Sequence, residues 1–296
     1  MNRISFACLT LLKCVSLATL FPEPVAAGGP TIIYGPGVRP LIYETQDVDY
    51  HVLDGTQITS PSRTGPPEDF VVVTDAIEFR GGGHIQIDGG IFQGGDASYT
   101  GVNGDLATVV AGAALHLRQS SGEVFGGTFI GGQATSSTWL GSTSGGHGLV
   151  LVESTITIHG GYFEGGVSRQ PDLFGGLRIM QEPGIMAHSG SHVLMYGGQV
   201  NGDIFLSGAS LSVFGFNFSY DGTRLSGNYP NGTPFNHTVR DRGGVFLNIV
   251  PEPSAALLVV VAGCMTVILR PRSTAWLHFN GRINSKSVVS RRLEKD

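Results

Sequence analysis

The sequence predicts an all-β protein, a single-stranded right-handed parallel β-helix (β-solenoid). Three observations support this fold class: a glycine-rich segment recurs five times, aliphatic residues alternate before each copy, and a phenylalanine follows most copies. The first glycine of each copy stands at 89, 126, 160, 197 and 215, so the intervals are 37, 34, 37 and 18 residues, close to multiples of 18. Repeats of this kind are typical of stacked coils, which bury their apolar side chains only against neighbouring coils.

Each copy predicts which side chains face the interior, because successive residues of a strand point to opposite faces. The inward positions before the glycines are Ile85/Ile87, Val124, Ile156/Ile158, Val193/Met195 and Leu211/Val213. After the glycines, an internal ladder is predicted at Phe92, Phe129, Phe163, Val200 and Phe218. The glycines mark a corner that needs positive φ or a close approach of the backbone. An upstream strand is expected at 77–79, 115–117, 149–152, 185–187 and 204–206.

The solenoid is expected to cover residues 76–221, with a cap at each end. Residues 28–75 are rich in proline and predict an N-terminal cap that enters the solenoid through 70–74. Residues 222–249 predict a C-terminal cap and spacer with a last strand at 245–249. Three longer segments rich in Gly, Ser, Thr and Asp are interpreted as protruding loops, with less regular extra coils as the alternative: 96–112, 133–148 and 167–183.

The first 27 residues have the layout of a secretory signal peptide. Arg3 gives a cationic start, an apolar stretch runs from Phe6 to Phe21, and small residues precede a cleavage site after Ala27. The chain is therefore expected to be exported, and the mature protein is expected to begin at Gly28.

The composition of residues 28–253 narrows the class of partner. This part contains 9 Arg, no Lys and 20 Asp plus Glu, so its formal charge is 9 − 20 = −11. Such an acidic domain is a poor partner for nucleic acid, whose binding depends on cationic contacts with phosphate. All three cysteines (Cys8, Cys14 and Cys264) lie outside it. The exported part therefore has no disulfides, although its compartment would permit them.

The stretch Val250-Pro251-Glu252-Pro253 precedes an apolar run at 255–269, which ends at Arg270 and Arg272. This layout resembles the PEP-CTERM sorting signal of exported Gram-negative bacterial proteins, and the resemblance covers residues 250–272. It implies a hydrophobic helix held in the inner membrane until an exosortase processes the tail. It also implies delivery to the cell surface, outer envelope or extracellular matrix, often within exopolysaccharide or biofilm systems.

This chain departs from that family in one respect. Family members usually end soon after the basic cluster, whereas here a polar, basic tail continues over residues 273–296. The apolar run of 15 residues is also shorter than the roughly 20 that span a bilayer as a helix. An ordinary C-terminal anchor or a buried helix are the alternatives to a sorting signal.

Catalytic signals are sparse, and no metal or cofactor site is predicted. Glycoside hydrolysis needs two carboxyl groups about 5–10 Å apart, yet Asp88 is the one carboxylate in the outward row before the glycines. Glu123 lies diagonally from it in the next coil. The sequence therefore favours a non-catalytic surface or matrix protein, with a polysaccharide lyase or hydrolase as the alternative.

The same outward row contains aromatic side chains. Phe125, His159, Tyr196 and Phe214 share one register and are candidates for stacking on sugar rings, since exposed apolar strips often mark contact sites. A carbohydrate-binding adhesin is therefore a further alternative. Coverage of the row by the inserted segments, or packing of the terminal cap, would explain the same residues without a ligand.

Overall fold

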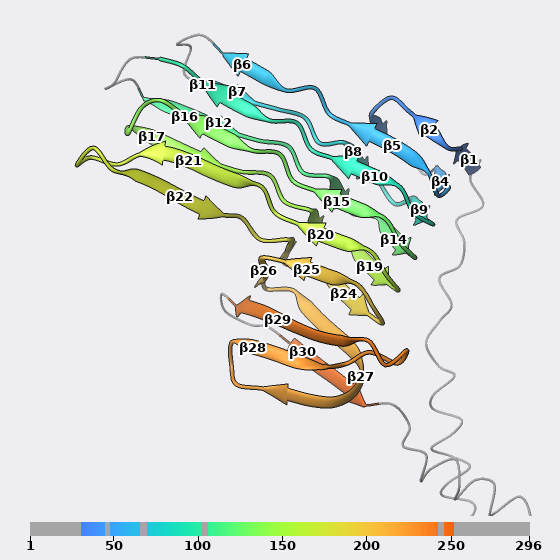
Figure 1. The fold of residues 1–296 in the computed structure, drawn as a ribbon. Coiled ribbons are helices and arrows are strands. Elements are labelled where there is room, and N and C mark those ends of the chain that lie inside the picture. Colours follow the sequence, from blue (N-terminus) through green and yellow to red (C-terminus); the bar gives the residue numbers. More distant parts are fainter. Residues whose placement is uncertain (1–30, 45–47, 66–69, 102–105, 242–245, 252–296) are drawn as a thin grey trace, which may run out of the picture. The chain divides into compact units, whose positions relative to one another are not determined.

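The computed structural model describes residues 31–44, 48–65, 70–101, 106–241 and 246–251. Their regular structure is entirely β, and the strands stack into a β-solenoid of about five turns, as predicted (Figure 1). No helix among these residues is long and apolar enough to cross a membrane. The predicted signal peptide at 1–27, the apolar segment at 255–269 and the tail at 273–296 lie outside the described residues.

Three sheets enclose the main core, and parallel strands stack in register within each. Sheet A contains β1 (Thr31–Tyr34), β4 (Asp49–Val52), β9 (His84–Ile87), β14 (Ser121–Val124), β19 (Thr155–Ile158), β24 (His192–Met195), β27 (Ser210–Tyr220) and β30 (Phe246–Pro251). Sheet B contains β2 (Gly37–Val38), β5 (Thr56–Thr59), β10 (Ile91–Gln93), β15 (Thr128–Ile130), β20 (Tyr162–Glu164) and β25 (Gln199–Asn201). Sheet C contains β3 (Ile42–Glu44), β8 (Ile77–Arg80), β13 (Leu115–Arg118), β18 (Leu149–Val152), β23 (Ile185–His188), β26 (Asp203–Ser207) and β29 (Pro234–Asp241).

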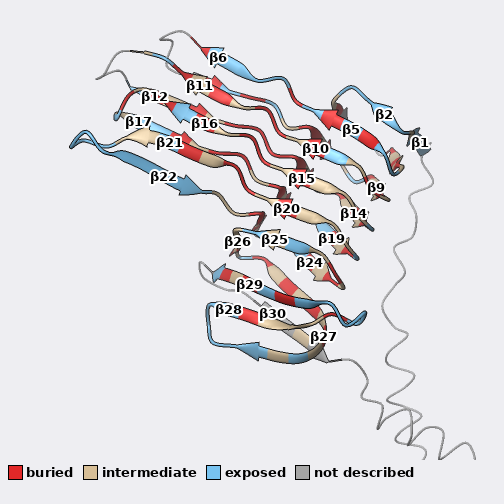
Figure 2. Cartoon of the chain, in the orientation of Figure 1, coloured by how far each residue is buried: buried red, intermediate tan, exposed pale blue. Residues whose placement is uncertain are grey.

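The predicted inward rows are confirmed. Every aliphatic side chain assigned to the interior before the glycines is buried (Figure 2). Phe92, Phe129 and Phe163 form the predicted ladder, with ring centroids 4.8 Å apart at both steps. Val200 continues it through its pairing with Phe163, and Ile58 extends it backwards through its pairing with Phe92. Burial of such large rings stabilises the coils against one another.

Phe218 does not belong to this ladder, contrary to the prediction. β27 runs past the corner at Gly215 and pairs antiparallel with β28 (Arg224–Asn228), so it never enters sheet B. Phe218 instead packs on Phe235 of β29, with ring centroids 6.0 Å apart. Through β28, which also pairs antiparallel with β29, sheets A and C join at this end of the solenoid.

The corner glycines behave as predicted. The second glycine of each of the first four pairs has a positive φ, between 97° at Gly198 and 121° at Gly90. The first glycine is crowded by the preceding coil: a Cβ on Gly197 would lie 2.1 Å from the carbonyl oxygen of His159. Both positions therefore require glycine, for two different reasons.

The three inserted segments are not loops, so that interpretation was wrong. Together with two earlier strands, β6 (Arg63–Gly65) and β7 (Phe70–Val72), they build a second, smaller lobe. Its sheet D contains β6, β11 (Ala97–Tyr99), β16 (Ala134–Ser136), β21 (Val167–Pro171) and β22 (Leu177–Gln181), and its sheet E contains β7, β12 (Ala107–Val110) and β17 (Gly141–Ser144). Apart from Tyr99, alanine and valine side chains fill this side lobe: Val71, Val73, Ala97, Ala107, Val109, Ala111 and Ala134.

Glycines form the junction between the two lobes, which we call the glycine waist. Here the outgoing and returning chains are close enough to share backbone hydrogen bonds. Gly112 donates to Gly95, Gly132 to Gly112, Gly146 to Gly132, and Gly166 to Gly146, at 2.7–3.0 Å. A Cβ on Gly146 would lie 1.8 Å from the carbonyl oxygen of Gly112, a distance that no side chain could occupy.

The two ends of the solenoid differ. Where an N-terminal cap was expected, β1–β3 form the first coil and β4–β7 belong to the second, and together these strands contribute to all five sheets. At the other end, the last strand covers Phe246–Pro251 instead of the expected 245–249. Val250 and Pro251 of the predicted sorting motif therefore belong to β30, where they pair with Phe214 and Gly215 of β27.

Candidate functional site

The predicted aromatic row exists on the outer side of sheet A. The rings of Phe125 and His159 stack with centroids 4.7 Å apart, those of His159 and Tyr196 at 5.3 Å, and those of Tyr196 and Phe214 at 4.0 Å. Their planes differ by no more than 14°. The spacing follows from the parallel register of the strands, which lie about 4.8 Å apart.

Stacking limits what the row can offer to a ligand. The facing surfaces of neighbouring rings cover one another, so the middle rings of His159 and Tyr196 present mainly their edges to solvent. Sugar rings bind aromatic side chains through the ring face. The ring face of Phe125 that points away from His159 is therefore the best surface for such a contact. Phe125 is also 45% exposed, whereas Tyr196 and Phe214 are partly buried.

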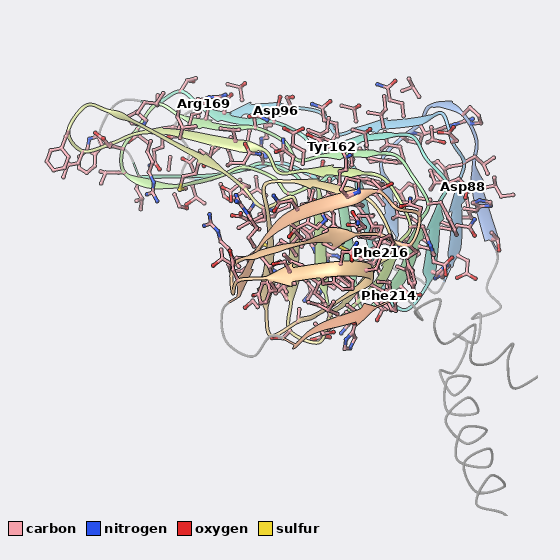
Figure 3. The ribbon with its side chains drawn as sticks, turned by 60° about the horizontal axis from the view of Figure 1, so that its bottom comes forward. Asp88, Asp96, Tyr162, Arg169, Phe214 and Phe216 are labelled. Atoms are coloured by element: carbon pink, nitrogen blue, oxygen red, sulfur yellow. The ribbon has the colours of Figure 1, made fainter. Side chains whose placement is uncertain are left out.

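A polar cluster lies next to Phe125 in the row. Asp88 occupies the same register one coil earlier, and its two carboxylate oxygens contact the His51 imidazole at 2.7 Å and the Gln86 amide at 2.9 Å. The hydrogen bond from Gln86 is the main reason that the pKa of Asp88 is lowered, with His51 adding to the effect. Asp88 is thus held as a carboxylate. Figure 3 shows Asp88 and Phe214 toward the same end of the molecule.

This geometry suits binding better than acid catalysis. A general acid needs a raised pKa near the working pH, whereas Asp88 is shifted the opposite way and both of its oxygens are engaged. Glu123, its predicted diagonal neighbour, lies one coil away, where it pairs with Gln86 in the backbone register. An aromatic face beside a carboxylate, an amide and an imidazole is the kind of surface that contacts polyols.

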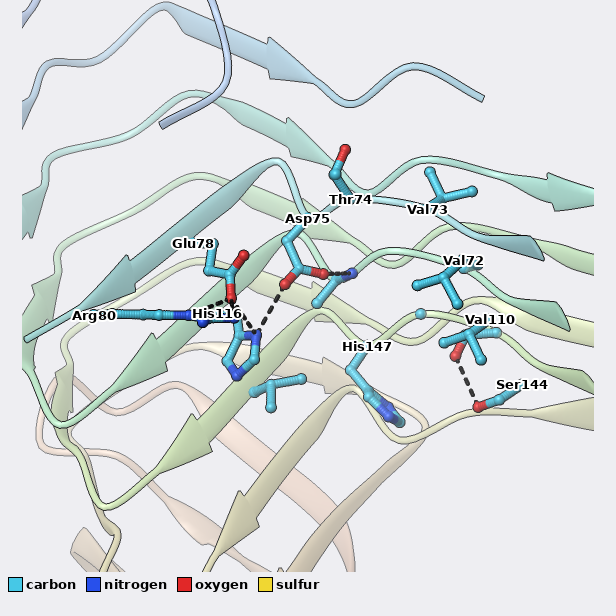
Figure 4. A pocket seen from close by; sticks show the side chains of 15 residues that line it. Val72, Val73, Thr74, Asp75, Glu78, Arg80, Val110, His116, Ser144 and His147 are labelled. Carbon is cyan, nitrogen blue, oxygen red and sulfur yellow. Dashed lines mark hydrogen bonds and ion pairs between the residues drawn. The ribbon is translucent and has the colours of Figure 1, made fainter. Parts of the chain in front are cut away.

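The structure also reveals a cleft that the sequence analysis missed. It holds about 420 Å³ where the side lobe meets sheet C, and strands of three successive coils line it (Figure 4). Asp75, Glu78 and Arg80 come from one coil, His116 from the next and His147 from the third. The register that aligns β8 with β13 pairs Glu78 with His116, so the repeat did contain a signal for this cluster.

Ion pairs and hydrogen bonds tie the cleft residues together. Nδ1 of His116 lies 2.9 Å from Asp75 Oδ2 and 3.9 Å from Glu78 Oε1. Asp75 also accepts a hydrogen bond of 2.6 Å from the backbone N–H of Ala113, and Arg80 Nε donates to Glu78 at 2.6 Å. Nε2 of His116 is buried without a hydrogen-bond partner among the described residues.

Asp75, Glu78 and His116 could together hold a divalent cation, since one ligand atom from each lies within 4.8 Å of the others. The same atoms already link adjacent coils, however, and the Arg80 guanidinium supplies positive charge beside Glu78. A cation would have to displace these interactions. We therefore interpret the trio as a structural connection between coils.

Two further ionisable residues near this junction are shifted towards their neutral forms. Burial lowers the pKa of His147, whose Nδ1 lies 3.2 Å from the carbonyl oxygen of Pro183. Burial raises the pKa of Glu182, which accepts a hydrogen bond from the backbone N–H of Gly145 at 3.2 Å. Desolvation has this effect on any charge near an apolar interior.

The predicted sorting residues are only partly described. Val250 and Pro251 lie in β30, whereas Glu252, Pro253, Arg270 and Arg272 lie outside the described residues, as does the predicted cleavage site at Ala27. In comparisons with known proteins, no family model matches this chain, and neither a curated protein nor a solved structure matches it. Its function must therefore be inferred from its own residues.

Proposed function

We propose that this chain is an exported, non-catalytic protein of the surface or extracellular matrix of a Gram-negative bacterium, sorted by a PEP-CTERM-type signal. The observation that supports this proposal most is the order of features after the last strand. Val250 and Pro251 end β30, and Glu252-Pro253, the apolar run at 255–269 and the basic pair Arg270 and Arg272 follow at once. A leader at 1–27 and a cysteine-free domain between the two signals support the same proposal.

Mass spectrometry of the mature protein tests this proposal. The full chain is produced in a Gram-negative host with and without an exosortase, and the termini are determined on purified protein. We expect an N-terminus at Gly28 and, with the exosortase, a C-terminus upstream of Ser273. A chain with Pro251 and Pro253 both replaced by Ala serves as the comparison and should keep its tail. A wild-type chain that remains intact through Asp296 when the enzyme is present contradicts the proposal.

A second candidate function is glycan contact at the Phe125 end of the aromatic row, which would link the protein to exopolysaccharide. The exposure of Phe125, at 45%, and its position beside the cluster of Asp88, Gln86 and His51 favour it. Since the exported part carries a charge of −11, neutral polysaccharides are the better partners than anionic ones.

Affinity electrophoresis in gels containing neutral or uronate-rich polysaccharides measures this binding. Phe125→Ser should abolish retardation, whereas Tyr196→Ser, which removes a ring between two others, should retain most of it. Ile91→Ser on sheet B is the matched control, since Ile91 is 48% exposed and Phe125 45%. Equal loss in the Phe125 and Ile91 variants, or unchanged retardation with Phe125→Ser, argues against a glycan site here.

A further inference from the structure

The hairpin of β21 and β22 carries the largest group of exposed apolar side chains among the described residues. Phe174 at its turn is 93% exposed and Leu173 64%, and Leu177, Ile179 and Met180 of β22 are exposed as well. These are five of the fourteen large hydrophobic side chains that are exposed in the described part of the chain. Patches of this kind mark contacts with a protein or a membrane.

The side lobe changes from two layers to one at this hairpin. In the two preceding coils the returning strand lies in sheet E, as β12 and β17, opposite the outgoing strand in sheet D. In this coil the returning strand β22 instead pairs antiparallel with β21 at the edge of sheet D. All five residues of β22 are consequently exposed, and the ribbon projects from the lobe (Figure 1).

The turn of this hairpin is held in one conformation. Asp172 Oδ1 accepts hydrogen bonds from the backbone N–H groups of Phe174, at 2.8 Å, and Gly176, at 2.7 Å. Leu173 and Phe174 are thus presented on a fixed turn. The hairpin's other charged side chains are Arg169 and Arg178.

These two arginines distinguish the hairpin from the rest of the exported part. Residues 167–181 carry 2 − 1 = +1 charge, while residues 28–253 together carry −11. Both arginines lie beside the apolar residues, since Arg169 pairs with Ile179 and Arg178 is next to Leu177. Figure 3 shows Arg169 on the side lobe, far from Asp88 and Phe214. Long basic side chains beside inserted apolar residues can reach phosphate headgroups.

A tryptophan lies on the neighbouring turn. Trp139 stands between β16 and β17, one coil earlier, and is 39% exposed. Figure 1 shows this turn and the β21–β22 turn at the same end of the side lobe. Tryptophan favours the boundary between water and lipid, because its ring is apolar and its N–H is polar.

We propose that this end of the side lobe, the lobe tip, inserts into the interfacial layer of a phospholipid bilayer. The lobe tip consists of Trp139, Leu173, Phe174, Leu177 and Ile179, with Arg169 and Arg178 at the level of the headgroups. Its apolar residues form a projecting ridge, which a fluid bilayer accommodates and which a protein partner could receive only in a matching groove. Insertion is shallow, because the free edge of β22 cannot enter the hydrocarbon.

Vesicle binding by residues 28–252 tests the proposal. This fragment avoids the apolar run at 255–269, which would bind lipid by itself. The compact unit that ends at Glu252 contains every described strand and both apolar cores, so the fragment retains the whole fold. Trp139 is its single tryptophan, because the other one in the chain is Trp276. The fluorescence of Trp139 therefore reports directly on the lobe tip.

Phosphatidylcholine vesicles with and without phosphatidylglycerol are added while Trp139 emission is recorded, and flotation measures binding separately. We expect a blue shift, stronger binding to the anionic vesicles, and weakening by salt through loss of the arginine contacts. Phe174→Ser should reduce binding at least tenfold, and Arg178→Gln should reduce it on anionic vesicles alone. Ile33→Ser in β1, where Ile33 is 63% exposed and Leu173 of the lobe tip 64%, should bind like wild type.

Two results overturn the proposal. One is an absence of flotation with either vesicle composition while circular dichroism shows the native β-structure. The other is sedimentation as a dimer that Phe174→Ser converts to a monomer, which would identify a second copy as the occupant of the lobe tip. Neither result affects the sorting proposal, which depends on the termini of the mature chain.

Discussion

Replacing Gly146 with Ala is the sharpest test of the glycine waist. The new Cβ would lie 1.8 Å from the carbonyl oxygen of Gly112 and 2.8 Å from the N–H nitrogen of Gly132. Since non-bonded contacts of a Cβ essentially never fall below 3.0 Å, the strands must separate by 3.0 − 1.8 = 1.2 Å. That movement breaks two hydrogen bonds, from Gly146 to Gly132 at 2.8 Å and from Gly166 to Gly146 at 2.7 Å.

The expected cost follows from those two bonds. A buried backbone group that loses its partner costs about 1–3 kcal/mol, so two losses cost about 2–6 kcal/mol. Alanine restricts the unfolded chain and returns about 0.4–1 kcal/mol. The net loss of unfolding free energy is therefore about 1–6 kcal/mol. Urea unfolding of residues 28–252 measures it, with circular dichroism reporting on the whole solenoid and Trp139 fluorescence on the side lobe.

Gly35→Ala is the matched control. Its Cβ would meet nothing closer than Arg39 Nη2 at 3.4 Å, and Gly35 has no positive φ. Its unfolding free energy should change by no more than about 0.5 kcal/mol. If Gly146→Ala changes stability as little as Gly35→Ala does, the two lobes are not joined at the close distance described.

Two further predictions concern the core and its ionisation. Phe129→Ala should cost about 3–5 kcal/mol in urea unfolding, because the ring is fully buried between Phe92 and Phe163; a cost below about 1 kcal/mol would refute the ladder. Burial lowers the pKa of His237 from 6.5 to about 4, so the unfolded chain binds more protons between these values. The contribution of neutral His237 to the unfolding free energy is therefore fully present above pH 6.5. Lowering the pH towards 4 should reduce the unfolding free energy by at most about 3 kcal/mol. His237→Gln should flatten that pH dependence, and an unchanged slope would exclude His237 as its source.

The main lobe could be predicted from the sequence because its residues are chemically distinct. Large aliphatic side chains alternate with polar ones, and Ile87 or Ile158 stands at the same distance from each glycine pair. Parallel stacking with a constant register turns such a repeat directly into rows of inward residues. The aromatic row followed from the same register, one position further along.

The side lobe escaped prediction because its core, apart from Tyr99, is made of alanine and valine. Ala97, Ala107 and Ala134 are buried, yet a sequence of Ala, Ser, Thr and Gly has the composition of a loop. The path of β27 could not be foreseen either. Its copy of the repeat has lost the second corner glycine, with Phe216 in that place, so the strand continues and pairs with β28.

The coil between Gly197 and Gly215 has a consequence for how this protein can change over time. Its chain passes from β25 to β26 without visiting sheets D and E, yet its main core is as well closed as in the longer coils. The side lobe is thus a set of insertions, each of which leaves and rejoins its coil at the glycine waist. Adding or removing such an insertion leaves the strand register of sheets A, B and C unchanged. During evolution, the side lobe of this fold could be lengthened, shortened or exchanged, while the inward rows of the main core continue to stabilise the protein.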